Sequence, residues 1–258
     1  MSDILKTIVE QKRIEVAELR VRGLQCRSRT QPRRPFSAAL RRLPAMALIA
    51  EVKKASPSRG ILRPDFDPVA IAQAYEQAGA DALSVLTDRQ FFQGSNEFLL
   101  RIRADTGIPV LRKEFIIDPL QVEESAGLNA DAMLLIAAIL SDAQLKELFM
   151  AARELDIEPL IEVHSRAELD RALTLSPEMV GINNRDLKTF KTDMAMTLEL
   201  IKFIPPGIIV ISESGIVSGD HTRRLLDAGV SAVLAGESLV TLADPRPRIE
   251  ELRHARKN

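Results

Sequence analysis

The sequence predicts an α/β protein, a single (β/α)8 TIM barrel preceded by an extra N-terminal helical segment. Two observations indicate this fold. Short apolar runs alternate with amphipathic helical patterns after residue 45, and a short pattern recurs where a predicted helix leads into a strand. Strands that alternate with helices form a parallel sheet, and eight such units in roughly 250 residues are typical of a closed barrel. We expect a helical extension over residues 1–44, packed on a barrel over residues 45–258.

The composition argues against several classes of protein. The chain has 258 residues, a formal net charge of −1 and a single cysteine, Cys26. A near-neutral charge gives no electrostatic reason to expect nucleic acid or an anionic membrane as a partner. No apolar run is long enough to span a bilayer, and the first residues lack the apolar core of a signal peptide. A lone cysteine suits a reducing compartment, so we expect a cytoplasmic protein, and a monomer.

The N-terminal segment is expected to begin with a helix over residues 2–22, which Gly23 ends. Eight arginines lie between residues 20 and 42. An arm that binds nucleic acid is one interpretation of this density, and a solvated leader packed on the barrel is the interpretation that we favour. A further hypothesis is that part of the leader, including Arg33 and Arg34, lines the mouth of the barrel and attracts an anionic substrate.

The barrel elements follow from hydrophobic periodicity. Strands are expected at residues 47–53, 81–86, 109–113, 131–136, 157–163, 179–183, 207–212 and 231–235. Helical patterns lie between them at residues 68–78, 95–105, 119–127, 141–155, 165–174, 194–203 and 219–228, and a last helix is expected at about 245–255.

A weak internal repeat supports this alternation. Gly79, Gly127 and Gly229 each follow an alanine and precede a predicted strand, as expected for a helix end, a C-cap glycine and a buried strand. The competing fold is a doubly wound open sheet. It would need fewer strands and a G-x-G-x-x-G motif after the first strand, which the sequence lacks.

The first strand and the loop after it organise the predicted site. Alternation along the strand places Glu51 and Lys53 on one face with Ile49. If helices cover the opposite, apolar face, this charged pair points to the other side of the sheet. A buried charge there needs an oppositely charged partner or a role in function. A Ser-Pro-Ser turn that begins at Ser56 follows, and it suits hydrogen bonding to an anion.

Polar side chains also end other predicted strands. They are Arg112 and Lys113 on the third strand, Glu162 on the fifth, and Asn183, Asn184 and Arg185 on the sixth. A single charge at a strand end is more often an ordinary salt bridge at the rim. Several acids and bases at one mouth are harder to explain as rim salt bridges, because the active sites of these barrels lie at the carboxyl ends of the strands. Neighbouring charges there also shift pKa values into the range that acid and base catalysis needs.

The seventh and eighth strands end in loops that contain Ser214-Gly215 and Gly236-Glu237. Glycine lets backbone N–H groups approach an anion, and these two loops form the usual phosphate site of such barrels. We therefore expect a phosphorylated small-molecule substrate. The scattered histidines show no metal-site spacing, and Cys26 lies in the leader, so we expect neither a metal nor a cysteine nucleophile. A lysine at a strand end could form a Schiff base, which keeps an aldolase as a rival.

These strand-end motifs resemble those of the indole-3-glycerol-phosphate synthase family over nearly the whole chain. The most specific is Glu-Val-Lys-Lys-Ala-Ser-Pro-Ser at residues 51–58. Other similar motifs are Leu-Arg-Lys-Glu-Phe at 111–115, Leu-Leu-Ile at 134–136, Ile-Glu-Val-His at 161–164, Ile-Asn-Asn-Arg-Asp-Leu at 182–187, Ser-Glu-Ser-Gly-Ile at 212–216 and Gly-Glu-Ser-Leu at 236–239. Residues 87–95 resemble the family's loop after the second strand.

The resemblance implies a lyase of tryptophan biosynthesis that needs no cofactor. It converts 1-(o-carboxyphenylamino)-1-deoxyribulose 5-phosphate to indole-3-glycerol phosphate and releases carbon dioxide and water. By resemblance, Lys113 is the general acid at the ribulose carbonyl, and Lys53 holds the substrate carboxylate and assists loss of the hydroxyl. Glu162 is the base and stabilises the cationic intermediate, Glu51 orients the lysines and shares base duty, and Asn183 binds a substrate hydroxyl.

The resemblance also implies which residues bind the substrate. The phosphate would lie on Ser56, Ser214, Gly215, Gly236 and Glu237; Phe92, Phe115, Leu134, Leu187 and Leu234 would pack around the anthranilate ring; Arg185 would orient the substrate near its carboxylate. Glu237 departs from the pattern, because some relatives carry serine there. Its contact to phosphate would be a backbone N–H, so a side chain turned outward is tolerable, whereas a charge that faces the phosphate is not.

Three alternatives remain. Phosphoribosylanthranilate isomerase shares the fold and phosphate site, but it would not need the motif at residues 51–58, and its acid/base pair usually includes a cysteine at a strand end. The others are a Schiff-base aldolase and a non-catalytic barrel that binds phosphosugars. Neighbouring enzymes of the tryptophan pathway are the candidate protein partners.

Overall fold

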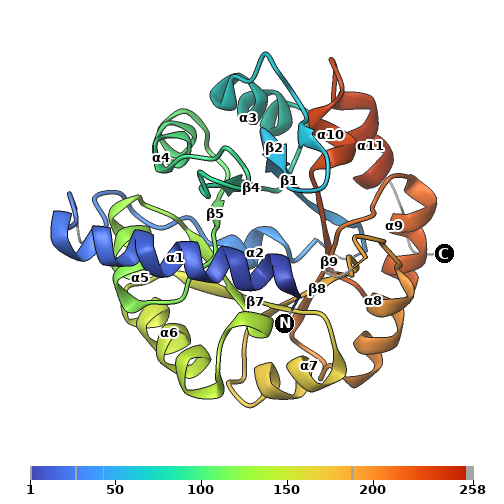
Figure 1. Ribbon diagram of the computed structural model, residues 1–258. Coiled ribbons are helices and arrows are strands. Elements are labelled where there is room, and N and C mark those ends of the chain that lie inside the picture. Colours follow the sequence, from blue (N-terminus) through green and yellow to red (C-terminus); the bar gives the residue numbers. More distant parts are fainter. Residues whose placement is uncertain (1, 27, 43, 187–188, 254–258) are drawn as a thin grey trace.

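Eight parallel strands close into a barrel in the computed structural model, which describes residues 2–26, 28–42, 44–186 and 189–253 (Figure 1). The strand order around the barrel is β1-β10-β9-β8-β7-β6-β5-β4. These strands are β1 (Ala47–Val52), β4 (Ala82–Leu86), β5 (Val110–Lys113), β6 (Ala132–Ile136), β7 (Glu158–Val163), β8 (Met179–Asn183), β9 (Ile209–Glu213) and β10 (Ala232–Ala235). The predicted (β/α)8 barrel is confirmed, and all eight strands occur within about two residues of the predicted bounds.

Helices surround the barrel. They are α1 (Asp3–Arg22), α2 (Phe36–Ala39), α3 (Pro68–Gln77), α4 (Asn96–Asp105), α5 (Pro119–Gly127), α6 (Asp142–Glu154), α7 (Arg166–Leu173), α8 (Ala195–Leu200), α9 (Gly219–Asp227), α10 (Glu237–Val240) and α11 (Arg246–Arg253). Short 3-10 turns, η1 (Ala137–Ile139) and η2 (Ile201–Phe203), and a hairpin of β2 (Ala55–Ser56) and β3 (Gly60–Ile61) complete the described elements. Residues 254 and 255 of the predicted last helix lie outside the described residues.

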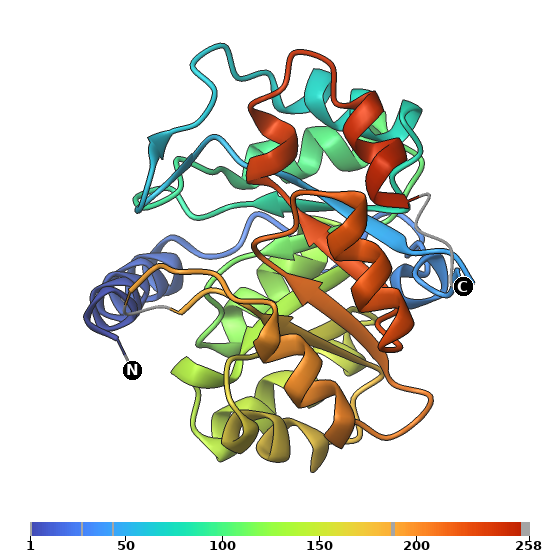
Figure 2. The same ribbon diagram turned by 90° about the vertical axis from the view of Figure 1, so that its right-hand side faces the viewer.

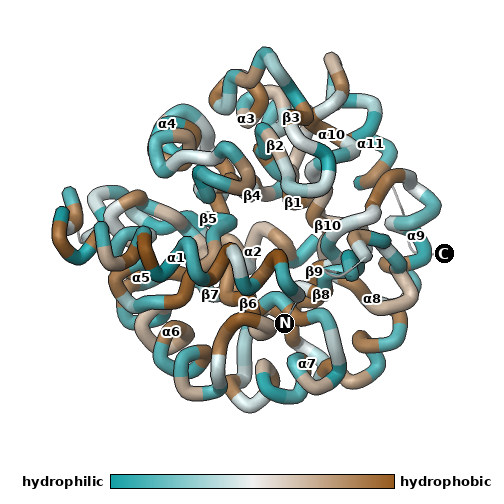
Figure 3. The backbone as a smooth tube through the Cα atoms, viewed as in Figure 1, coloured by the Kyte–Doolittle hydropathy of each residue, from teal (hydrophilic) through white to brown (hydrophobic). Residues whose placement is uncertain are grey.

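Two features explain why these segments fold as they do. The strands are apolar and almost wholly buried, because side chains fill the barrel interior and helices cover its outside. The outer helices alternate hydrophobic and hydrophilic residues along their length (Figure 3). The helices α3, α4, α5, α6, α7 and α9 begin after a serine or aspartate whose side chain accepts a backbone N–H from the first turn. Each such cap contributes about 1 kcal/mol, which fixes where these helices start.

The internal repeat needs one correction. Gly79 and Gly229 do follow helix ends, at φ +92° and +97°, in the left-handed region that favours glycine. Gly127 is instead the last residue of α5, and Asn129 adopts the left-handed conformation at φ +59°. The prediction that Gly127 caps the helix is therefore wrong. A Cβ at position 127 would overlap the carbonyl of Cys26, so this glycine makes room for the leader.

The leader runs from one end of the barrel to the other. In Figure 2, α1 lies at the left, against the carboxyl ends of the strands, and the blue chain around α2 lies at the right. Arg33 pairs with Asp156 and Glu158, and the Arg34 guanidinium donates to the Ile108 carbonyl, 2.9 Å away. These partners precede or begin strands, at the base of the barrel. The hypothesis that Arg33 and Arg34 line the mouth is therefore wrong.

Replacing Arg33 and Arg34 with alanine is expected to leave KM for an anionic substrate unchanged. The same change should lower the free energy of unfolding by about 1–3 kcal/mol per residue, because the largely buried Glu158 carboxylate and the partly buried Ile108 carbonyl lose their donors. Urea unfolding and steady-state kinetics measure the two effects. Arg223→Ala is the matched control, since this arginine is half-exposed and pairs with Asp220 on the surface, and its effect should stay within about 0.5 kcal/mol. A higher KM in the double variant would contradict the placement at the base.

No helix in the described part of the chain is long and apolar enough to cross a membrane. The division of the chain at residue 44 into an extension and a barrel stays a prediction.

Candidate active site

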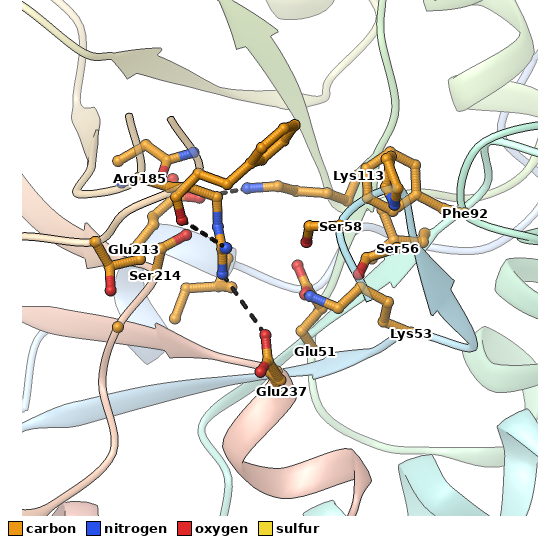
Figure 4. Close-up of a pocket in the computed structure, with 18 of the residues that line it drawn as sticks. Glu51, Lys53, Ser56, Ser58, Phe92, Lys113, Arg185, Glu213, Ser214 and Glu237 are labelled. Carbon is orange, nitrogen blue, oxygen red and sulfur yellow. Dashed lines mark hydrogen bonds and ion pairs between the residues drawn. The ribbon is translucent and has the colours of Figure 1, made fainter. Parts of the chain in front are cut away.

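A cavity of about 720 Å3 opens at the carboxyl ends of the strands (Figure 4). Its volume lies within the usual range of small-molecule sites. Most of the residues that the sequence predicts for the site line this cavity, while Leu187 lies outside the described residues. Arg112 and Asn184, which were expected at the same mouth, are not in the cavity wall, and Arg112 is instead buried against Glu124 and Ser125. The N-terminal half of α1 also contributes to the wall, through Ile4, Leu5 and Ile8. The parallel strands thus bring residues that are far apart in sequence to one end of the barrel.

Lys113 occupies the centre of the charged part of the cavity. It is the last residue of β5, its Nζ lies 3.1 Å from Glu162 Oε2, and it pairs with Glu213 as well. Burial disfavours its charge, but the carboxylates of Glu213, Glu162 and Glu51 outweigh burial and raise the pKa of Lys113 well above its ordinary value. The side chain is therefore an ammonium at neutral pH, held in a fixed place, as a general acid must be before it donates.

The two carboxylates on Lys113 differ in their ionisation. Burial opposes the charge of Glu162, yet Lys113 and His164, together with the Asn183 amide, lower its pKa to about 2. Burial raises the pKa of Glu213 to about 7, and the charge of Glu162 adds to this effect although Lys113 opposes it. One ammonium cannot fully compensate two buried carboxylates, so one of the pair stays ionised and the other titrates near neutrality.

Glu213 is a site residue that the sequence analysis did not select. It ends β9 with 1% of its surface exposed, and it points into the same space as Lys113. A Cβ at Gly181 of the neighbouring strand β8 would overlap the Glu213 carboxylate, so this glycine makes the room that the glutamate occupies. The signal was a glycine inside a buried strand, which often marks a close approach of another group.

Glu51 and Lys53 form a second charged pair beside the first. Lys53 Nζ lies 2.6 Å from Glu51 Oε1, and both side chains are largely buried in the cavity wall. A Cβ at Gly236 would overlap the Glu51 carboxylate, so the glycine after β10 leaves space for this glutamate. Glu51 therefore faces the interior, as the alternation along β1 predicted.

His164 extends the charged cluster toward the surface. Its Nε2 lies 3.4 Å from Glu162 Oε1, and its Nδ1 lies 3.5 Å from Glu168 Oε2. Burial lowers the pKa of His164, but the nearby carboxylates of Glu168 and Glu162 outweigh burial and raise it. The imidazole thus sits between two carboxylates and helps to keep Glu162 ionised.

The loops after β9 and β10 form the opposite side of the cavity. Ser214 adopts φ +68° and Gly215 φ +77°, so a non-glycine residue holds a left-handed conformation that costs about 1–3 kcal/mol. The Asn184 amide secures the loop by donating to the Ser214 carbonyl, 3.1 Å away. The Ser56 hydroxyl, in the wall of the same cavity, has no hydrogen-bond partner among the described residues. A strained loop and an unpaired buried hydroxyl are consistent with a site for an external anion.

One wall of the cavity is apolar. Phe92 and Phe115 lie with their ring centroids 5.9 Å apart, and Leu134 and Leu234 contribute further apolar surface. Asp88 holds the loop that carries Phe92, because its carboxylate accepts the backbone N–H of Phe92 at 3.0 Å. This wall suits a flat aromatic group.

Arg185 reaches the cavity from the loop after β8. It pairs with Glu237 at 3.6 Å, as the dashed line in Figure 4 shows, and Arg59 pairs with the same glutamate at 2.9 Å. Among the described residues, no group of three or more His, Cys, Asp or Glu side chains is arranged to hold a metal ion. The arrangement therefore offers a protonated lysine, two carboxylates of different pKa, an aromatic wall and an anion side within one enclosed space.

Comparison with known proteins places this geometry in a family. The fold is shared with 3-hexulose-6-phosphate synthase, at a TM-score of 0.65, 14% identity and coverage of 81% of this chain and 99% of that one. It is also shared with a thiamine phosphate pyrophosphorylase from Pyrococcus furiosus, at a TM-score of 0.61, 16% identity and coverage of 80% and 93%. Identities this low show the barrel fold alone.

Sequence relatives are much more similar. The indole-3-glycerol phosphate synthase of Desulfotalea psychrophila is 46% identical over 257 residues, which are 98% of this chain and 99% of that protein. The synthase of Geobacillus thermodenitrificans is 56% identical over 214 residues, covering 82% and 83%. The family model described as indole-3-glycerol phosphate synthase matches residues 5–252. The chain belongs to the indole-3-glycerol phosphate synthase family.

Proposed function

We propose that the cavity catalyses the decarboxylating ring closure of 1-(o-carboxyphenylamino)-1-deoxyribulose 5-phosphate to indole-3-glycerol phosphate. The chain is then a carboxy-lyase of tryptophan biosynthesis, as its family membership indicates. The observation that carries the proposal is the position of Lys113, an enclosed ammonium between Glu162 and Glu213, in the same cavity as an aromatic wall and an anion side.

Ring closure begins with an acid at the carbonyl oxygen. The Lys113 ammonium donates a proton to the ribulose carbonyl as the ring carbon attacks it, so that the new hydroxyl carries that proton. Attack generates a cationic iminium, which the buried Glu162 carboxylate stabilises at short range. Loss of carbon dioxide returns its bonding electrons to the ring system and neutralises this cation.

Dehydration then completes the indole ring. The hydroxyl leaves as water with a proton from Lys53, and Glu162 accepts the proton released from the ring carbon. The pair of Glu51 and Lys53, at 2.6 Å, keeps the lysine oriented in the empty site, and Glu51 shares the base role. Asn183 binds a substrate hydroxyl from a position beside Glu162. Each group acts on one atom of the substrate, so the reaction depends on a folded substrate conformation.

Substrate binding divides between the two walls of the cavity. The phosphate lies against the loops of Ser214, Gly215 and Gly236 and the free hydroxyl of Ser56, while the aromatic ring packs on Phe92, Phe115, Leu134 and Leu234. Arg185 orients the substrate carboxylate. Leu187 belongs to the proposed apolar wall on the family resemblance alone.

Two enzymatic alternatives agree less well with the cavity. An isomerase that uses a cysteine finds none in the cavity wall, since Cys26 lies in the leader. A Schiff-base aldolase needs an unprotonated lysine, whereas the carboxylates around Lys113 raise its pKa. The proposal also includes the cytoplasm as the site of the reaction and a monomer as the working unit, which the single cysteine and the completeness of the cavity within one chain support.

The test of the function is turnover of the purified chain with the carboxyphenylamino-deoxyribulose phosphate, followed by the rise of indole fluorescence. We expect product formation and release of one carbon dioxide per turnover. A parallel sample treated with borohydride in the presence of substrate should retain its mass and activity. A folded protein without turnover, or covalent trapping of substrate on a lysine, would contradict the proposed reaction.

A dependence of activity on pH is expected from Glu213. Because its pKa is raised to about 7, kcat/KM should rise as the pH increases through that value, when the ionised carboxylate begins to stabilise the cationic intermediate. Glu213→Gln should remove this limb of the profile. A limb near pH 6 from the substrate phosphate remains in both proteins and serves as the internal control. Identical profiles for the wild type and the variant would contradict this role.

A further inference from the structure

A carboxylate already binds the two arginines on the anion side of the empty cavity. Glu237 Oε1 lies 2.9 Å from Arg59 and Oε2 lies 3.6 Å from Arg185. Arg59 lies on the hairpin between β2 and β3, Arg185 on the loop after β8, and Glu237 at the start of α10 after β10. The three side chains line the same cavity as Ser56, Ser214 and Gly215. The bridge therefore joins loops on both sides of the proposed phosphate position.

Two further cations of the cavity are also paired with carboxylates. Lys53 pairs with Glu51, and Lys113 pairs with Glu162 and Glu213. These three glutamates are buried, with between 1% and 5% of their surface exposed, so they cannot turn away. The Glu237 side chain is 29% exposed, and that of Arg59 is 65% exposed. Glu237 is thus the carboxylate of this group that can leave its partners and be hydrated.

From this contrast we infer that Glu237 is an affinity-setting residue, an internal stand-in for the substrate phosphate that the phosphate must displace. In the free protein its carboxylate holds Arg59 and Arg185. When a phosphorylated ligand enters, Arg59 exchanges the carboxylate for phosphate oxygens, Arg185 becomes free for the substrate carboxylate, and Glu237 turns to solvent. A protein whose binding-competent state is only partly populated binds more weakly by that fraction. Glu237 therefore weakens the binding of substrate and product alike.

This weakening has a use in the cycle. The inference rests on the proposed function, in which the substrate loses its carboxylate but the product keeps the phosphate. Product release then depends on breaking contacts to phosphate, and an adjacent carboxylate that recaptures the arginines shortens the lifetime of the product complex. We expect Glu237 to raise KM and to speed product dissociation together.

The test compares Glu237→Gln and Glu237→Ser with the wild type. Both substitutions keep the backbone N–H and remove the competing charge. We expect both variants to lower KM about 3- to 10-fold, and to lower the inhibition constant of indole-3-glycerol phosphate by the same factor. This is the scale expected when a partly exposed ion pair no longer competes with the ligand. Product dissociation, followed by stopped-flow fluorescence, should slow by a similar factor. A merely structural role would raise KM or lower the thermal midpoint instead.

Asp220→Asn is the matched control. Asp220 lies in the first turn of α9, is 68% exposed and pairs with Arg223, so its removal changes the charge at the same end of the barrel without freeing Arg59 or Arg185. We expect no change in KM for this variant. An equal fall in KM for Asp220→Asn, or an unchanged or higher KM for both Glu237 variants, would overturn the inference.

Calorimetric titration with inorganic phosphate separates this inference from the proposed function. Tighter phosphate binding by Glu237→Gln than by the wild type and by Asp220→Asn supports the stand-in role even if the wild type shows no turnover, which would refute the proposed reaction alone. Turnover by the wild type with equal phosphate affinity in all three proteins would refute the stand-in role alone.

Discussion

Replacing Lys113 with methionine is expected to lower kcat by about 10²- to 10⁴-fold, the contribution of a positioned general acid. The loss should appear in kcat, because the variant removes the proton donor while the aromatic wall and the phosphate loops remain. The protein should stay folded. Without the ammonium, Glu213, whose pKa is already raised to about 7, takes up a proton and relieves the repulsion with Glu162.

The measurement is steady-state turnover with circular dichroism as a check of folding. Lys54→Met provides the matched control, since Lys54 follows the strand-end lysine Lys53 but is absent from the cavity wall. Its kcat should stay within about twofold of the wild type, the scale of a neutral surface change. A Lys113→Met enzyme that retains more than a tenth of the wild-type kcat would remove Lys113 from the role of general acid.

Replacing Lys12 with methionine is expected to lower the free energy of unfolding by about 3–5 kcal/mol, as for breaking a buried ion pair. Lys12 lies on α1 with 1% of its surface exposed, and its Nζ is 2.7 Å from Asp88 and 3.0 Å from Glu114. Burial opposes its charge, but Glu114 and Asp88 outweigh burial and raise the pKa of Lys12 above its ordinary value. The variant leaves two buried carboxylates without their cation.

Activity should fall together with stability in this variant. Asp88 orders the loop of Phe92, and Glu114 lies next to Lys113, so the lysine ties α1 to two loops of the cavity. Urea unfolding measures the stability, and a higher KM would show that the apolar wall with Phe92 has lost its order. Lys6→Met, on the same helix but exposed and paired with the exposed Asp3 at 3.2 Å, should change stability by less than about 0.5 kcal/mol. Equal effects of the two variants would refute the buried-pair account.

Most of the barrel could be predicted from the sequence because its strands are buried on both faces. Such strands form continuous apolar runs, and the serine or aspartate caps between them mark where helices begin. The elements that were missed are short. The helices α2 and α10 and the hairpin of β2 and β3 span too few residues for a period of 3.6 or 2 to appear.

Those residues of the candidate site that are charged and lie at the end of an apolar strand could be predicted from the sequence. Glu51, Lys113 and Glu162 stand out because charge interrupts an apolar run, and the cavity brings them together as expected. Glu213 was missed, because its burial depends on the space left by Gly181 on another strand. The burial of Lys12 was missed for a similar reason. A lysine on a helix is usually solvated, and only the tertiary fold places two carboxylates around this one.

The base of the barrel shows a further limit. The sequence shows that the leader is rich in arginine, but it does not show whether these arginines face a substrate or the start of a strand. Their position depends on where the chain turns after α1, which local patterns do not encode. Asn129 at the end of α5 is a milder case, because both asparagine and glycine tolerate the left-handed conformation and the sequence offered both.

The path of the leader also has a consequence for biosynthesis of the chain. The helix α1 leaves the ribosome before the barrel strands, yet the carboxylates that receive Lys12 belong to segments that follow β4 and β5, and β1 finds its partner β10 only after the other strands have been made. Until then its apolar stripe of Leu5, Ile8 and Val9 has no barrel to cover. Until the barrel forms, this exposed apolar stripe is therefore a part of the growing chain that is prone to aggregate.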